Sequence, residues 1–252
     1  MAVSHLSFPH VEFARTGLQT VVCQLRFNPL YRIGLEPPVA FQEALMPILP
    51  RSSEGAEGHF EFRVSAGASV ESSMTPSAEA RLWKFSSEDE QWVATLATSY
   101  VSLETTAYVR FEDFLERLIS VQETFQELYP VTRFTRVGLR YINVFDQEKF
   151  PGGWANRFNH HLLGPSADKL IGDSITRTQL VFVASEPNWT VTIRSGGDDK
   201  SYRLDLDHSN QASIAKEQVR GLVEDYHRRN YQLFRWAITN EMFQEMEPLK
   251  RE

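Results

Sequence analysis

The stretch FTRVGLRYINVF, residues 134–145, decides the fold. Its apolar side chains Val137, Leu139 and Tyr141 alternate with arginines and a glycine. Successive side chains of a β-strand point to opposite faces, so this pattern predicts a strand with one face in the core. The earlier stretch GLQTVVCQLRFN, residues 17–28, alternates in the same way. Its Leu25-Arg26-Phe27 matches Leu139-Arg140-Tyr141, which indicates that the two stretches are equivalent strands.

Each of these two strands opens a similar order of elements. The first is followed by a short helix at 41–49, a polar loop at 51–58, strands at 59–65, 80–86, 91–97 and 99–105, and an amphipathic helix from Phe111 to Leu128 that Pro130 ends. The second is followed by a short helix at 154–163, strands at 176–184, 188–195 and 201–207, and a long helix from its N-cap Ser213 to about Phe243.

This order predicts an α+β fold built from a duplicated β-α-(β)n-α unit. The halves are residues 1–130 and 131–252, joined in one structural unit with a mostly antiparallel, curved sheet that two longer helices cover. The order of elements resembles the saddle-like duplicated fold typified by the TATA-binding protein, and the helix-grip folds. Fold likeness of this kind implies no function.

Composition restricts the class of protein. The chain has 252 residues, 42% of them hydrophobic and 23% charged, with a net charge of -7, which is globular composition and speaks against broad nucleic-acid binding. Cys23 is its one cysteine, so it forms no internal disulfide and no cysteine-based zinc site; on the apolar face of its strand it is expected to be an inert thiol. No signal peptide and no run of about 18 apolar residues occurs, which predicts a cytoplasmic protein without a membrane span.

Several segments together resemble a sporadically distributed, uncharacterised bacterial protein family of about this length. They are Pro9-His10-Val11-Glu12, then Trp83, Phe85 and Ser86, then Leu103, Glu104, Thr105 and Tyr108, and then Arg136, Gly138, Leu139, Arg140, Tyr141 and Asn143. The resemblance implies one fold over the whole chain and a bacterial origin. The patchy distribution of the family implies mobile or defence-associated genes. The resemblance implies no activity, cofactor or catalytic residue.

The first candidate site is an arginine face. Arg136 and Arg140 point to the same side of their strand, and Gly138 between them leaves room for a ligand or backbone to approach. Arg26 is the matching residue of the first half, and Glu104 and Asn143 complete the candidate ligand-binding set. Such a face predicts binding of a phosphate, a nucleotide or an acidic peptide. The alternative is that the arginines pair with Glu104 or Glu12 within the chain, or simply lie in solvent.

The second candidate site is acidic. Asp205, Asp207 and His208 end a strand, and with Glu104 they are the groups that a Mg²⁺-dependent or Mn²⁺-dependent hydrolase or nuclease would need near one point. The alternative is the alternating charge of an exposed strand face, and no lysine follows at the spacing of the common metal-nuclease pattern.

The leading functional hypothesis is a non-enzymatic binding or adaptor protein that needs no cofactor. It would engage a protein partner, a second copy of itself or an anionic ligand. The long C-terminal helix supports a partner, because Tyr231, Trp236 and Phe243 lie partly outside its apolar stripe. The alternatives are the metal-dependent enzyme and a purely structural subunit of a larger bacterial assembly.

Overall fold

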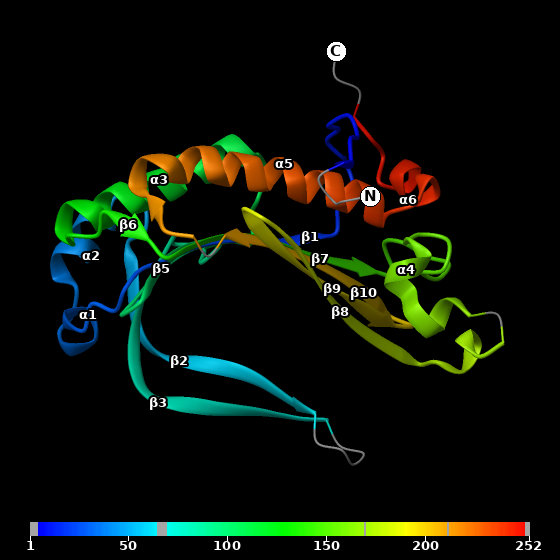
Figure 1. Cartoon of the computed structure of the whole chain (residues 1–252), viewed down its shortest axis with the longest axis horizontal. Helices are drawn as coiled ribbons and strands as arrows, with labels where there is room; N and C mark the ends of the chain where they lie inside the picture. Colours follow the sequence, from blue (N-terminus) through cyan, green and yellow to red (C-terminus); the bar gives the residue numbers. More distant parts are fainter. Residues whose placement is uncertain (1–4, 65–69, 169, 211, 250–252) are drawn as a thin grey trace.

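The computed structural model describes residues 5–64, 70–168, 170–210 and 212–249 (Figure 1). Its helices are α1 Arg32–Leu35, α2 Val39–Leu45, α3 Phe111–Leu128, α4 His160–Leu163, α5 Val219–Ala237 and α6 Asn240–Glu245. The strands of the main sheet are β1 Leu18–Arg26, β2 Arg51–Val64, β3 Val70–Ser86, β4 Trp92–Ala97, β5 Tyr100–Thr105, β7 Arg136–Asp146, β8 Arg177–Glu186, β9 Trp189–Asp198 and β10 Ser201–Asn210. Two short strands, β6 Arg133–Phe134 and β11 Ile214–Ala215, pair separately.

The main sheet is antiparallel and runs through both halves of the chain. Its nine strands lie in the order β2-β3-β4-β5-β1-β7-β10-β9-β8. The two strands of matching sequence, β1 and β7, are neighbours at its centre, and Cys23 lies opposite Leu139. The α+β class and the large antiparallel sheet are therefore confirmed.

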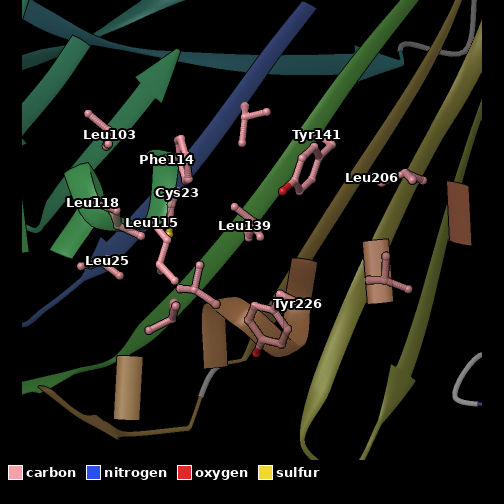
Figure 2. Packing of buried hydrophobic residues seen from close by; sticks show 14 of the residues in the cluster. Cys23, Leu25, Leu103, Phe114, Leu115, Leu118, Leu139, Tyr141, Leu206 and Tyr226 are labelled. Carbon is pink, nitrogen blue, oxygen red and sulfur yellow. The ribbon is translucent and has the colours of Figure 1, made fainter. Parts of the chain in front are cut away.

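One face of the sheet carries the core. Cys23 and Leu25 of β1 and Leu139 of β7 are buried under Phe114 of α3 and Tyr226 of α5 (Figure 2). Figure 1 shows α3 and α5 lying across this face. Burial of each large apolar side chain contributes about 1.5–3 kcal/mol, so this layer is the main source of stability. The 18 and 19 residues of α3 and α5 are amphipathic, and no helix in the described part of the chain is long and apolar enough to span a membrane.

The opposite face carries no helix, and the β2–β3 hairpin bends away from the central strands and runs beneath them (Figure 1). The predicted polar loop at 51–58 is wrong, because these residues lie in β2 and pair with β3 from Arg51 opposite Ser86 onward. β2 is an edge strand, and residues 51–54 are exposed, so a polar sequence suits it without any loop.

The C-terminal helix is also shorter than the sequence indicated. Ser213 is not its N-cap, because Ile214 and Ala215 pair with β6, and α5 begins at Val219. The helix ends at Ala237, since Ile238 is extended and bridges to Phe158; Thr239 then caps α6 by accepting a hydrogen bond from the Met242 amide at 3.2 Å. In the predicted helix at 154–163, only His160–Leu163 is helical.

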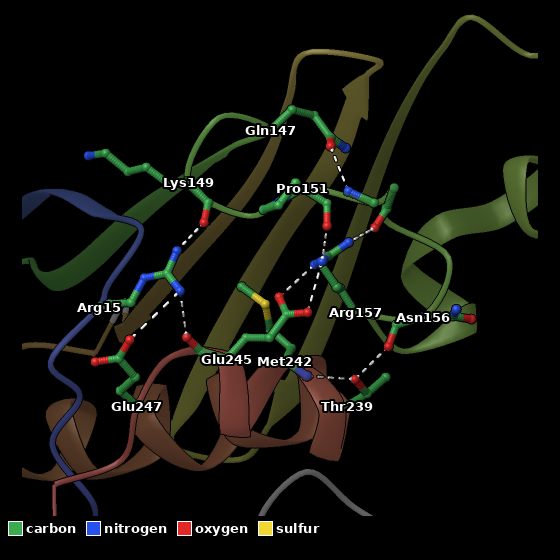
Figure 3. A network of polar contacts seen from close by, with 12 residues as sticks. Arg15, Gln147, Lys149, Pro151, Asn156, Arg157, Thr239, Met242, Glu245 and Glu247 are labelled. Atoms are coloured by element: carbon green, nitrogen blue, oxygen red, sulfur yellow. Dashed lines mark hydrogen bonds and ion pairs between the residues drawn. The ribbon is translucent and has the colours of Figure 1, made fainter.

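The chain ends are joined by an ion-pair network (Figure 3). Arg157, 4% exposed, donates to both carboxylate oxygens of Glu245 at 2.9 and 2.8 Å and to the carbonyls of Pro151 and Gly153. Arg15 donates to the carbonyl of Glu245 at 3.3 Å. The N-terminal segment, the loop after β7 and α6 are thereby held together.

Candidate functional site

The predicted arginine face exists, and it meets the predicted acidic strand. Arg140 of β7 donates from Nε and Nη2 to the two carboxylate oxygens of Asp205 in β10, at 2.8 and 2.6 Å. Arg136 makes a single contact, donating from Nη2 to Oδ1 of Asp207 at 3.4 Å. Because β7 and β10 are neighbours, two sites that the sequence treated separately form one charged network on the helix-free face.

Asp205 is the centre of that network. Its side chain is fully buried, and Arg194 and Arg203 approach it to 3.6 and 3.7 Å in addition to Arg140. The hydrogen bond to Asp205 raises the pKa of Arg140 against the opposing effect of burial. Burial also raises the pKa of Asp207. Removing a carboxylate from water is costly unless it is paired, so these arginines are engaged in stabilising Asp205.

The remaining predicted residues of the arginine face lie in different surroundings. Arg26 joins Arg136: the two lie opposite each other in the β1–β7 pair, and both donate to Gln24, at 2.8 and 3.4 Å. Arg136 also occupies the space above Gly138, where its Nη1 lies 2.6 Å from where a Cβ would stand. In the strand register Val22 of β1 lies between Glu104 and Arg140. Asn143 is buried on the helix-covered face, where it donates to the Leu204 carbonyl at 3.2 Å.

The residues of the metal alternative are not brought to one point either. Asp205 and Asp207 share the helix-free face, whereas His208 is buried on the other face and its Nδ1 lies 2.8 Å from Oδ1 of Asn230 in α5. Within the residues that the structure describes, no three His, Cys, Asp or Glu side chains are arranged to hold a metal ion. Burial lowers the pKa of His208 to about 4, so it is a neutral core side chain.

A cavity of about 430 Å³ lies on the helix-covered side of the sheet. Its walls are residues 10–18, the start of α3 with the loop before it, α5, and the strands β7 and β10. Six of its twenty lining residues are Phe or Tyr, namely Phe13, Tyr108, Phe111, Tyr141, Tyr231 and Phe234. The volume is in the range of small-molecule sites, which are concave and mostly apolar with a few placed polar groups.

A chain of polar side chains crosses the cavity wall. The hydroxyl of Tyr141 lies 2.8 Å from Nδ1 of His227 and also bonds to the hydroxyl of Tyr108. Phe111 stacks on the His227 ring at 3.9 Å with an interplanar angle of 3°, which fixes the imidazole in place. Burial lowers the pKa of His227 to about 4 and raises that of Tyr108 to about 12. At neutral pH the chain is therefore uncharged.

The N-terminal segment closes one side of the cavity. Tyr231 of α5 donates to the Pro9 carbonyl at 2.8 Å and accepts from the Val11 amide at 2.9 Å, and Gln232 donates to the Phe8 carbonyl at 2.9 Å. Phe13 packs edge-on against Phe243 of α6 with ring centroids 5.4 Å apart. Two of the aromatic residues expected to face a partner, Tyr231 and Phe243, therefore have contacts within the chain.

Asn143 offers a polar atom to a ligand. It uses its amide nitrogen on Leu204, and no hydrogen bond to its Oδ1 is found in the part of the chain that the structure describes. The His227 ring is bonded to Tyr141 through Nδ1, and its centroid lies 5.9 Å from that of His10. Glu12, Arg110 and Glu112 also line the site; all three are exposed, and Arg110 is paired with Asp113 at 3.3 Å.

The sequence did not predict this cavity as a site, although several of its residues lie in the segments that resemble the bacterial family. His10, Glu12, Tyr108, Tyr141 and Asn143 all occur in the segments that carried the family resemblance, and the fold brings them together. His227 was overlooked. The available signal was helical spacing, because His227 and Tyr231 are four residues apart and so lie on one side of α5, beside the apolar stripe.

Comparison with known proteins adds nothing to this geometry. Neither the scan against protein-family models nor the searches of curated proteins and of solved structures produced a match to the chain. The cavity is therefore interpreted from its own residues.

Proposed function

We propose that the protein is a non-enzymatic binding protein that holds a small, planar organic molecule in the cavity between α3, α5 and the N-terminal segment. The observation that carries this proposal is the aromatic cavity of about 430 Å³ crossed by the Tyr108–Tyr141–His227 chain. An aromatic lining favours a flat ligand, because stacked and edge-on ring contacts contribute about 0.5–1.5 kcal/mol beyond the buried area.

The charges select an uncharged or cationic ligand. His227 is neutral at pH 7 because of its lowered pKa, and Glu12 and Glu112 at the rim outnumber Arg110. Oδ1 of Asn143 is an acceptor, so it favours a ligand that donates a hydrogen bond. The anionic ligand expected from the arginine face finds less support, since Arg136 and Arg140 bond to Asp207 and Asp205.

Binding is also better supported than catalysis. The tyrosine hydroxyls stay protonated at neutral pH because burial raises the pKa of Tyr108 to about 12 and holds that of Tyr141 well above its ordinary value. His227, with a pKa of about 4, is a weak base. Groups of this kind orient a ligand by hydrogen bonds and transfer no proton readily at pH 7.

Three probes of one shape test the proposal, namely benzylamine, benzyl alcohol and benzoate. We expect saturable binding of the amine and the alcohol by calorimetry or ligand-observed NMR. Benzoate should bind at least about tenfold more weakly, which corresponds to 1.4 kcal/mol. Glu12→Gln should weaken the amine alone, with Glu241→Gln on exposed α6 as the matched control.

Tyr141→Phe should weaken the alcohol, because it removes the hydroxyl that bonds to His227 and Tyr108. Tyr226→Phe is its matched control, since the buried hydroxyl of Tyr226 bonds to no other group of the described chain and does not line the cavity. Absence of binding by all three probes, or benzoate as the tightest of them, would overturn the proposal.

We propose, in addition, that the chain arose by duplication and that its sheet is saddle-like. If Leu25 corresponds to Leu139, then Gln24 corresponds to Gly138, and these two residues lie directly opposite each other in the β1–β7 pair. A pseudo-two-fold axis through that pair relates β1 to β7, β5 to β10, β4 to β9 and β3 to β8, in agreement with the strand order. It also relates α3 to α5. β2 is left over as an addition to the first half.

A further inference from the structure

Strand β8 ends the sheet with an exposed apolar edge. In the described chain it pairs only with β9, so the amides and carbonyls on its other side face outward. Val181, Phe182 and Val183 are 57%, 41% and 65% exposed. The residues around them, QLVFVAS at 179–185, include no charge, proline or glycine.

Such an edge is unusual for a chain that stays alone. Proteins protect edge strands with lysine, proline, bulges or a covering element, because an open edge pairs with any other strand of suitable sequence. β8 has none of these protections over its central residues, and it pairs with β9 without a bulge from Arg177 to Glu186. The unprotected edge is therefore ready to accept another strand.

The sequence of β8 is complementary to itself. Two copies that pair edge to edge are related by a two-fold axis perpendicular to the sheet, which makes the strands antiparallel. If the axis passes at Phe182, this residue faces its own copy, and Val181 faces Val183 of the second copy. Phe182 then packs beside its copy on one face of the sheet and Val181 beside Val183 of the second copy on the other, and apolar cross-strand pairs of this kind stabilise a sheet.

The charges at the ends of β8 agree with the same register. Thr178 lies opposite Glu186 of the second copy, so Arg177 lies diagonal to that carboxylate. Arg177 is 78% exposed, and its pairing with Asp198 at 3.3 Å leaves guanidinium nitrogens for a second acceptor. Because of the two-fold axis, Arg177 of each copy lies near Glu186 of the other copy, so this contact occurs twice.

We infer that two copies of this chain pair through β8, with Phe182 on the two-fold axis, and form one continuous antiparallel sheet. The axis leaves the helices of both copies on the same side, and it leaves both cavities open, because β8 is not part of their lining. The dimer is therefore independent of the ligand proposed above.

The first test measures mass in solution by light scattering at micromolar concentration. We expect the wild-type protein at twice the 29.0 kDa of the chain. Phe182→Lys and Val183→Lys should each give a monomer with an unchanged circular dichroism spectrum, since both side chains are exposed. Leu35→Lys is the matched control; Leu35 of α1 is 77% exposed and lies away from β8, so this variant should remain a dimer.

The second test measures the register by cysteine cross-linking, which is clean because the one native cysteine, Cys23, is buried. Phe182→Cys should form an intermolecular disulfide under mild oxidation, because directly opposed Cα atoms are about 4.5–5.5 Å apart. Gln179→Cys should not, since six residues of strand place its two copies about 20 Å apart. A monomeric wild type, a lysine variant that stays dimeric, or equal cross-linking at 179 and 182 would overturn the inference.

Discussion

Asp205 shows how a single buried carboxylate organises the helix-free face of the sheet. A charge with no exposed surface would be severely destabilising alone, and three arginines from β7, β9 and β10 surround it. Arginine suits this role because its planar guanidinium bonds to both oxygens of a carboxylate, as Arg140 does here. Arg136 and Arg140, which suggested an external anionic ligand, thus pair with carboxylates of the chain itself.

Loss of Asp205 should therefore be costly. We expect Asp205→Ala to lower the free energy of unfolding by about 3–5 kcal/mol, because it leaves Arg140 and Arg194 without their carboxylate. Arg203→Ala should cost less than about 1 kcal/mol, since Arg203 is 53% exposed and its interaction is screened by water. Urea unfolding of both variants measures the difference. Equal losses would show that the buried carboxylate contributes no more to stability than its exposed partner Arg203.

Two histidines, the buried His208 and the half-buried His227, make stability depend on pH. Burial lowers the pKa of His208 and of His227 to about 4, below the ordinary value of 6.5. Between pH 6.5 and 4 the unfolded chain therefore binds protons that the folded chain does not, so stability falls as the pH falls. A shift of this size corresponds to about 3 kcal/mol for the fully buried His208.

His208→Gln tests this dependence, because glutamine can still bond to Asn230 and does not titrate. We expect its free energy of unfolding to decrease less than that of the wild type between pH 7 and pH 4.5. His161→Gln is the control, since His161 is exposed, and it should follow the wild type. The same slope in all three proteins would exclude a neutral buried His208.

Among the elements, the β8–β9 pair depends on one glycine. A Cβ on Gly196 would stand 2.2 Å from the Thr178 carbonyl oxygen and 2.8 Å from the Cα of Gln179. Because both contacts are backbone atoms, no side chain can move aside. Gly196→Ala should lower the unfolding free energy by about 1–3 kcal/mol, whereas Gly221→Ala, with open space around its Cβ, should stabilise α5 by up to about 1 kcal/mol. Thermal unfolding followed by circular dichroism compares them, and similar midpoints would contradict the expected clash.

The same scale shows which elements a sequence can reveal. Central strands were predictable, because Val137, Leu139 and Tyr141 report burial on one face by alternation alone. Edge strands and breaks were not. β2 is polar because no core covers residues 51–54, and α5 ends at Ile238 because that residue bridges to Phe158, about 80 residues earlier. Contacts between distant segments leave no local pattern.

The candidate site followed the same division. The orientation of Arg136 and Arg140 was correct from the strand period, and the pairing of Arg140 with Asp205 needed the knowledge that β10 lies beside β7. Asn143 is an odd number of residues from Arg136 and Arg140, so the alternation of a strand was enough to predict that it lies on the opposite face. The meeting of His10 with His227 was not, because it depends on how the N-terminal segment crosses α5.

At the scale of the whole molecule, Arg157 joins the loop after β7 to Glu245 of α6, and Arg15 of the N-terminal segment bonds to the carbonyl of the same residue (Figure 3). Arg157→Ala should lower the unfolding free energy by about 3–5 kcal/mol, because it leaves a partly buried carboxylate and two carbonyls unpaired. Arg228→Ala is the control; that arginine is 72% exposed and pairs with Asp225, and its loss should cost less than about 1 kcal/mol. Urea unfolding distinguishes them, and a small loss for Arg157→Ala would show that the network contributes little.

The way the N-terminal segment crosses α5 has a consequence for how the protein is made. Phe8 and Val11 bond to side chains that lie 224 and 220 residues later, and Leu249 donates to the carbonyl of Glu12 at 2.8 Å. Contacts between residues so far apart in the sequence form late in folding, because the entropy cost of closing a long loop comes before the contacts can stabilise the fold. During synthesis the N-terminal segment can dock only after α5 and Leu249 have been made. The aromatic wall around Tyr108 and Tyr141 therefore stays open to water until that late docking step closes it.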